Sequence, residues 1–200
     1  MNNMISYTEA KNIKMKIIPV PLDSYKTGSG FLFKEGLISL HSCDNFIIIK
    51  HEYIHKIVNP IVLNNKSYCN KFSPSFDYAK TFDSIKTGYN DLNTFIYECI
   101  VRAVDHCVDD MDNTFKNMVK RTNDVGNRSN SEIVEMTIKN DYKKGFVLVP
   151  YFCNYFRENR KSMNFKTMVI NAMKDYNGEY IVENGSTIDI HSLNTPEKIS

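Results

Sequence analysis

Three absences narrow the class of protein first. The sequence has no Trp, no C-x-x-C pair, and no run of about 18 apolar residues that could cross a membrane as a helix. Without paired cysteines, a zinc cluster held by thiolates is not expected. Residues 1–16 also lack the apolar segment and the small-residue cleavage site of a secretory signal. We therefore expect a cytoplasmic protein, or an exported one if this chain is a piece of a longer precursor.

An excess of charge of one sign is missing as well. The 25 basic and 23 acidic residues are interspersed, and the most basic stretch, residues 157–166, also holds Glu158. No basic patch of the kind that binds nucleic acid is therefore expected. The five cysteines are odd in number and not closely paired, which predicts reduced, mostly buried thiols. With 42% apolar residues, 12 Phe and 12 Tyr, the chain can bury a core.

The motif that indicates a chemistry is His51-Glu52-Tyr53-Ile54-His55. Residues four apart lie on one face of an α-helix, so both imidazoles can face one metal ion. Glu52 projects onto a neighbouring arc, where it can act as general base on a zinc-bound water without binding the metal. By composition, such a motif arises by chance roughly 0.006 times in a chain of this kind. The apolar run before it, residues 46–49, implies a buried helix, so we predict one zinc ion.

A catalytic zinc needs a third protein ligand, and Glu98 is the preferred candidate. It lies in a second apolar helical segment, where a lone carboxylate is costly unless it is paired. An ordinary helical ion pair with Arg102, four residues on, is one alternative. His106 as the third ligand is another. If Glu98 binds zinc, Arg102 and Asp105 are expected to orient the ligand side chains without binding the metal themselves.

Local signals predict a β-hairpin followed by helices. The hairpin covers residues 31–34 and 37–42, and the metal helix is expected to end near Val58, because Pro60 disfavours helix at the preceding residue. Residues 64–90 are predicted as a long loop with at most one helical turn. The remaining expectations are a helix over 94–109 capped by Asp91 or Asn93, a mobile loop at 121–130, a helix from the Ser129-x-x-Glu132 capping box to Lys144, and helices over 146–160 and 165–176.

Together these elements predict an α+β fold of the zincin type. A small antiparallel sheet is expected to pack on the metal-binding helix, followed by a mostly helical C-terminal half. We expect one catalytic domain over residues 1–176, with the sheet and metal helix in 1–60 and the helical part in 91–176. Residues 177–200 are expected to form a tail.

Three segments resemble a known family: HEYIHKIVNPIV, FIYECIVRAV and GFVLVPYFCNYFRENRKSMNFKTM. They are similar to a bacterial family of domains of unknown function, family 4932, whose members look like gluzincin-type metallopeptidases. The resemblance covers roughly residues 31–173, and its specific parts are the H-E-x-x-H-x-x-x-N-P and E-x-x-x-R-A runs. It implies His51, His55 and Glu98 as zinc ligands and Glu52 as the base, and it matches Arg102 to an arginine of the family.

The function expected from these residues is zinc-dependent hydrolysis, with a peptide or protein as the preferred substrate. The hydrolysis also needs a donor to the oxyanion, and Tyr97, Tyr151, Tyr155 and His106 all stay open as candidates. The main alternative is a degenerate or truncated metallopeptidase-like domain that serves as a metal-binding or interaction module. A zinc hydrolase acting on another amide or ester is a further alternative. The oligomeric state is not indicated by the sequence.

Overall fold

The part of the chain that the structure describes is built from helices. The computed structural model describes the backbone of residues 15–19, 28–33, 36–41, 46–108, 128–181 and 187–189, and the side chains of residues 50–106, 128–129 and 131–178. Of the residues with described side chains, 79% lie in helices and none lies in a strand. The fold of this part is therefore all-α, and the prediction of an α+β fold with an antiparallel sheet is wrong.

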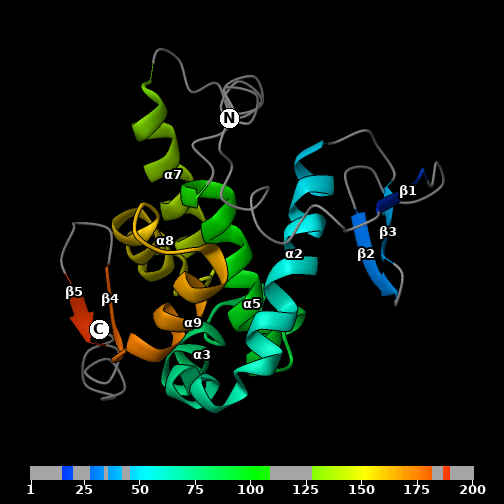
Figure 1. Cartoon of the computed structure of the whole chain (residues 1–200). Helices are drawn as coiled ribbons and strands as arrows, with labels where there is room; N and C mark the ends of the chain where they lie inside the picture. Colours follow the sequence, from blue (N-terminus) through cyan, green and yellow to red (C-terminus); the bar gives the residue numbers. More distant parts are fainter. Residues whose placement is uncertain are drawn as a thin grey trace.

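Short strands occur only outside that helical body, among the backbone segments described. Strands β1 (Met15–Pro19), β2 (Gly28–Phe33) and β3 (Gly36–His41) pair in the order β1-β3-β2. β2 and β3 are antiparallel, but β1 lies parallel to β3, so the small sheet is mixed. It lies beside α2, away from the other helices (Figure 1). Strands β4 (Glu179–Ile181) and β5 (Thr187–Asp189) pair near the C-terminus. The described core is formed by helices and their connections.

Helix α2 spans Phe46–Asn64 and runs through Pro60, so the prediction that it ends near Val58 is wrong. A proline inside a helix costs about 3 kcal/mol. The last turns of α2, however, bury Ile61 and Val62 in the core, and burying two such side chains contributes about 3–6 kcal/mol. The side-chain amide of Asn65 also donates to the carbonyl of Ile61 at 2.7 Å. Apolar packing therefore continues the helix beyond the proline.

The segment predicted as a long loop, residues 64–90, is also helical. It forms a 3₁₀ helix, η2 (Lys66–Phe72), and two short α-helices, α3 (Ser73–Ala79) and α4 (Asp83–Gly88). Each contributes buried apolar side chains, among them Phe72 and Ile85. These helices are too short to show a clear apolar period, and their packing on the core stabilises them. The polar composition therefore predicted the wrong structure here.

Helix α5 (Leu92–Ala103) lies against α2 in the middle of the molecule (Figure 1). Asp91 is its N-cap and accepts a hydrogen bond from the amide of Thr94 at 2.9 Å. The helix continues as a π-helix, η3 (Val104–Val108). The helix predicted over 94–109 is thus confirmed to Val108. Residues 121–127 of the predicted mobile loop lie outside the described residues.

Three further helices complete the described fold. α7 (Asn130–Lys143) begins with the predicted capping box, in which the side chains of Ser129 and Glu132 each bond the other residue's backbone amide. α8 (Val149–Asn159) has Pro150 in its first turn, and α9 (Phe165–Asp175) is capped by Asn164. None of the described helices is both long and apolar enough to cross a membrane. The described cysteines Cys69, Cys99 and Cys153 are buried and form no disulfide, as expected.

Replacement of Gly145, which follows α7, is expected to change the stability of the protein measurably. Its φ is +93°, and a Cβ there would lie 2.6 Å from Cγ1 of Ile85 and 2.8 Å from Cβ of Phe82. Gly145→Ala is therefore expected to lower the free energy of unfolding by about 1–3 kcal/mol from backbone strain alone. Gly88→Ala is the control, because nothing lies within 4 Å of a Cβ at that position. Urea unfolding should separate the two variants, and equal midpoints would contradict the packing described here.

Candidate metal centre

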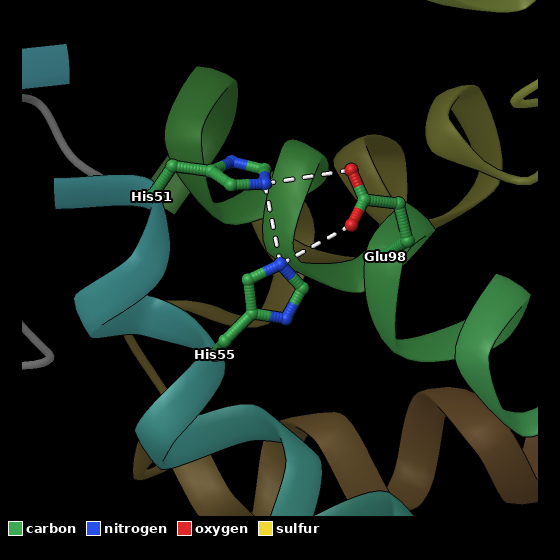
Figure 2. Close-up of side chains that lie close together, drawn as sticks. All are labelled: His51, His55 and Glu98. Carbon is green, nitrogen blue, oxygen red and sulfur yellow. Dashed lines mark hydrogen bonds and ion pairs between the residues drawn. The ribbon is translucent and has the colours of Figure 1, made fainter. Parts of the chain in front are cut away.

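The two motif histidines lie on the face of α2 that is turned toward α5. His51 and His55 are one helical turn apart, and Glu98 points from α5 toward both rings (Figure 2). α2 and α5 pack closely along this face. Apolar side chains of both helices, among them Ile54 on α2 and Ile100 on α5, are buried in one hydrophobic core. Helix periodicity thus aligns the histidines, and the packing of α5 brings the carboxylate to them.

The distances among the three side chains match those of a metal site. The Nε2 atoms of His51 and His55 are 3.2 Å apart. Nε2 of His51 is 3.4 Å from Oε1 of Glu98, and Nε2 of His55 is 3.1 Å from Oε2. Two ligand atoms bound tetrahedrally to one zinc ion at its usual distances lie about 3.3 Å apart. His51, His55 and Glu98 therefore form a group that could hold a metal ion.

The electrostatics of this group favour a cation. Glu98 is only 7% exposed. Burial alone would raise its pKa, but hydrogen bonds from His51 and His55 and the charge of Arg102 hold the pKa well below its usual range. Burial would lower the pKa of His51, yet its bonds to Asp105 and Glu98 raise that pKa to about 10. The raised pKa of His51 reflects the negative charge of Asp105 and Glu98 beside its ring, and such a charge also favours a metal cation.

The outer nitrogen of each imidazole is held by a hydrogen bond. Nδ1 of His51 donates to Oδ2 of Asp105 at 2.7 Å, and Nδ1 of His55 donates to Oδ1 of Asn59 at 3.1 Å. With Nδ1 engaged in this way, Nε2 of each ring faces Glu98 and can bind a metal once it gives up its proton. Asp105 was predicted to support the site, and the structure places it against His51. Asn59 was missed, although its position four residues after His55 was a usable signal.

Arg102 and His106 are arranged around a second buried carboxylate. Nε of Arg102 donates to Oε1 of Glu98 at 2.9 Å, so the ion pair considered as an alternative coexists with the histidine contacts. A terminal nitrogen of Arg102 donates to Oδ1 of Asp141 at 3.0 Å, and Nε2 of His106 donates to Oδ2 of the same residue at 2.7 Å. His106 thus bonds Asp141 and is not part of the ligand group. Asp141 was missed, because nothing in its sequence neighbourhood on α7 distinguishes it.

In the π-helix η3, two consecutive residues bond side chains on two different helices. Asp105 bonds His51 on α2, whereas His106 bonds Asp141 on α7. A π turn contains more residues than an α turn, so it changes the faces on which successive side chains lie. Such turns often occur at functional sites. Here the widened turn follows directly on the helix that carries Glu98 and Arg102.

The proposed base and the oxyanion candidates differ in their surroundings. Glu52 is half-buried and makes no hydrogen bond or ion pair within the part of the chain described, so its carboxylate is available to a substrate or water. The hydroxyl of Tyr97 donates to Thr94, although its ring lies edge-on to His55 at 5.8 Å. Tyr151 and Tyr155 donate to groups on α9, so neither hydroxyl serves the ligand group.

Tyr89 is a further residue that the sequence did not single out. Its ring packs edge-on against Phe146 at 5.4 Å. Burial, and then the charge of nearby Glu98, raise the pKa of its phenol, while Arg102 acts in the opposite direction. Tyr89 is therefore a neutral hydroxyl beside the pair formed by Glu98 and Arg102.

Comparison of the chain with models of protein families, with curated proteins and with solved structures gave no match.

Proposed function

We propose that this chain is a zinc-dependent hydrolase of the gluzincin type that cleaves peptide bonds. The observation that carries the proposal is the closeness of the ligand atoms, one each from His51, His55 and Glu98, all within 4.8 Å of one another, with Glu52 adjacent on α2. The resemblance to family 4932 points to the same activity, and membership of that family is part of the proposal.

The donor set supports zinc as the metal. Two imidazole nitrogens and one carboxylate oxygen are a ligand set of catalytic zinc sites, which use three protein ligands and keep one position open. Thiolates, which would indicate a structural zinc site or an iron–sulfur cluster, are absent from the group. When bound, zinc would polarise the scissile carbonyl and make a water molecule acidic near neutral pH.

The side chains of the protein would perform the proton transfers. Glu52 accepts the proton of the attacking water and delivers it to the leaving nitrogen. Its carboxylate suits this task, because no described residue occupies it with an ion pair. Asp105 and Asn59 hold His51 and His55 so that Nε2 of each faces inward. Glu98 completes the ligand set and carries the negative charge that keeps the cation in place.

A metal-binding module without catalysis is the second candidate. It is favoured by one observation: the hydroxyls of Tyr97, Tyr151 and Tyr155 are all engaged away from the ligand group. Catalysis then needs an oxyanion donor from elsewhere, and Tyr89 is the described phenol that lies beside Glu98 and Arg102. Loss of activity in Tyr89→Phe with retained zinc would favour the hydrolase over the module.

We expect the purified protein to hold about one zinc ion per chain and to cleave an unfolded protein substrate. Metal analysis and a fluorogenic protease assay measure the two properties independently. Removing the metal with a chelator should abolish cleavage, and stoichiometric zinc should restore it, whereas magnesium should not. Absence of zinc from the protein, even after incubation with zinc, would contradict the proposal. Bound zinc without hydrolysis of peptides, amides or esters would favour the module.

A further inference from the structure

Asp141 is connected to the metal ligands through a single guanidinium group. Arg102 donates to Oε1 of Glu98 at 2.9 Å and to Oδ1 of Asp141 at 3.0 Å. One arginine thus bridges a carboxylate on its own helix, α5, and a carboxylate on α7, 39 residues further on. The planar guanidinium fixes both directions at once, which a lysine ammonium would not do.

Both carboxylates of this connection are buried, and the arginine between them is largely covered. Asp141 is 6% exposed and Glu98 is 7% exposed. The guanidinium of Arg102 lies over the ring of Phe146 at 3.8 Å. The second oxygen of Asp141 accepts a hydrogen bond from His106, so both oxygens are engaged. Removing one partner of such a buried network leaves the other charges without compensation.

The backbone that carries Asp141 is also held in place. Asp141 lies in the last turn of α7, and its carbonyl accepts the amide of Phe146 at 3.0 Å across the turn that contains Gly145. The same turn thus positions Asp141 and places the Phe146 ring beneath Arg102. The carboxylate of Asp141 therefore comes from a rigid element, whereas the side chain of Arg102 has several rotatable bonds.

We propose that Asp141 is a positioning residue of the metal centre, acting through Arg102 on Glu98. With Arg102 held by Asp141, the guanidinium fixes Oε1 of Glu98 at 3.4 Å from Nε2 of His51, and Oε2 then lies 3.1 Å from Nε2 of His55. Asp141 thereby sets the orientation in which the Glu98 carboxylate meets the metal. This inference rests on the proposed zinc site and adds to it a residue from a helix that bears no ligand.

The test compares Asp141→Asn with Glu135→Gln, both made in the full chain. Glu135 is the matched control, since it lies on the same helix and pairs with an arginine, Arg157, at 2.7 Å, but is 49% exposed. Zinc affinity is measured by competition with a chromophoric chelator, and coordination by the visible absorption of the cobalt(II)-loaded protein. We expect Asp141→Asn to bind zinc roughly 10–100-fold more weakly and to change the cobalt spectrum, with Glu135→Gln unchanged in both.

A double-mutant cycle separates positioning from a purely structural role. Arg102→Lys is expected to weaken zinc binding by a similar factor, and adding Asp141→Asn to it should cause little further loss, because both act through one connection. Wild-type zinc affinity and an unchanged cobalt spectrum in Asp141→Asn, with only a lower melting temperature, would overturn the proposal. If Asp141→Asn does not fold, unchanged zinc affinity in Arg102→Lys overturns it instead. A wild-type chain that binds no zinc refutes the proposed function itself, and the inference falls with it.

Discussion

Glu52→Gln is expected to retain zinc and to lose peptide-bond hydrolysis by roughly 10²–10⁴-fold, the usual contribution of a general base. Gln has the shape of Glu but cannot accept the proton of the attacking water. Glu52 is not part of the group that could hold a metal ion, so the zinc content should stay at the wild-type value. Because Glu52 has no ion pair among the described residues, the melting temperature should change little.

The experiment measures kcat/KM for a fluorogenic peptide, zinc by metal analysis, and the thermal unfolding of each protein. Glu158→Gln serves as the matched control, because Glu158 is exposed on α8 and lies outside the ligand group. It should behave as wild type in all three measurements. Full activity of Glu52→Gln with bound zinc would remove Glu52 from the mechanism, and loss of zinc from it would place Glu52 among the ligands.

Glu98→Ala is expected to lose zinc and, with it, the stabilisation that zinc brings. The metal would join α2 to α5, and at a free zinc concentration of 1,000 times Kd it should stabilise the wild type by about 4 kcal/mol. Glu98→Ala should show almost none of this increment. The variant will also be less stable without metal, because it leaves Arg102 without one of its two carboxylate partners.

The decisive quantity is therefore the change in melting temperature caused by zinc, measured separately for each protein. Subtracting the melting temperature of the metal-free protein removes the effect of the broken ion pair between Glu98 and Arg102, because that effect is the same with and without zinc. Asp91→Ala is a suitable control, since it removes the cap of the same helix α5 and destabilises the fold without touching a ligand. Its zinc-induced shift should equal that of the wild type. A normal shift in Glu98→Ala would exclude Glu98 as a ligand.

Signals within a few residues of one another predicted their structures well. The capping box at Ser129 and Glu132 and the Asp91 cap both depend on contacts one turn away. The alignment of His51 and His55 on one helix face also depends only on their spacing of one turn. The choice of Glu98 came from a different argument, the cost of a lone carboxylate in an apolar helix, and the structure places that side chain against both histidines.

What the sequence determined by itself is thus local: the helical motif, most caps, and the residue types able to bind a metal. The tertiary structure decided the all-α fold of the described part, the helices within residues 64–90, and the continuation of α2 through Pro60. It also decided the pairing of His51 with Asp105, 54 residues away, and of Arg102 with Asp141. The physical reason is the same in each case. Burial of side chains such as Ile61 and Val62 depends on helices distant in sequence, and its free energy exceeds the local preferences that the sequence displays.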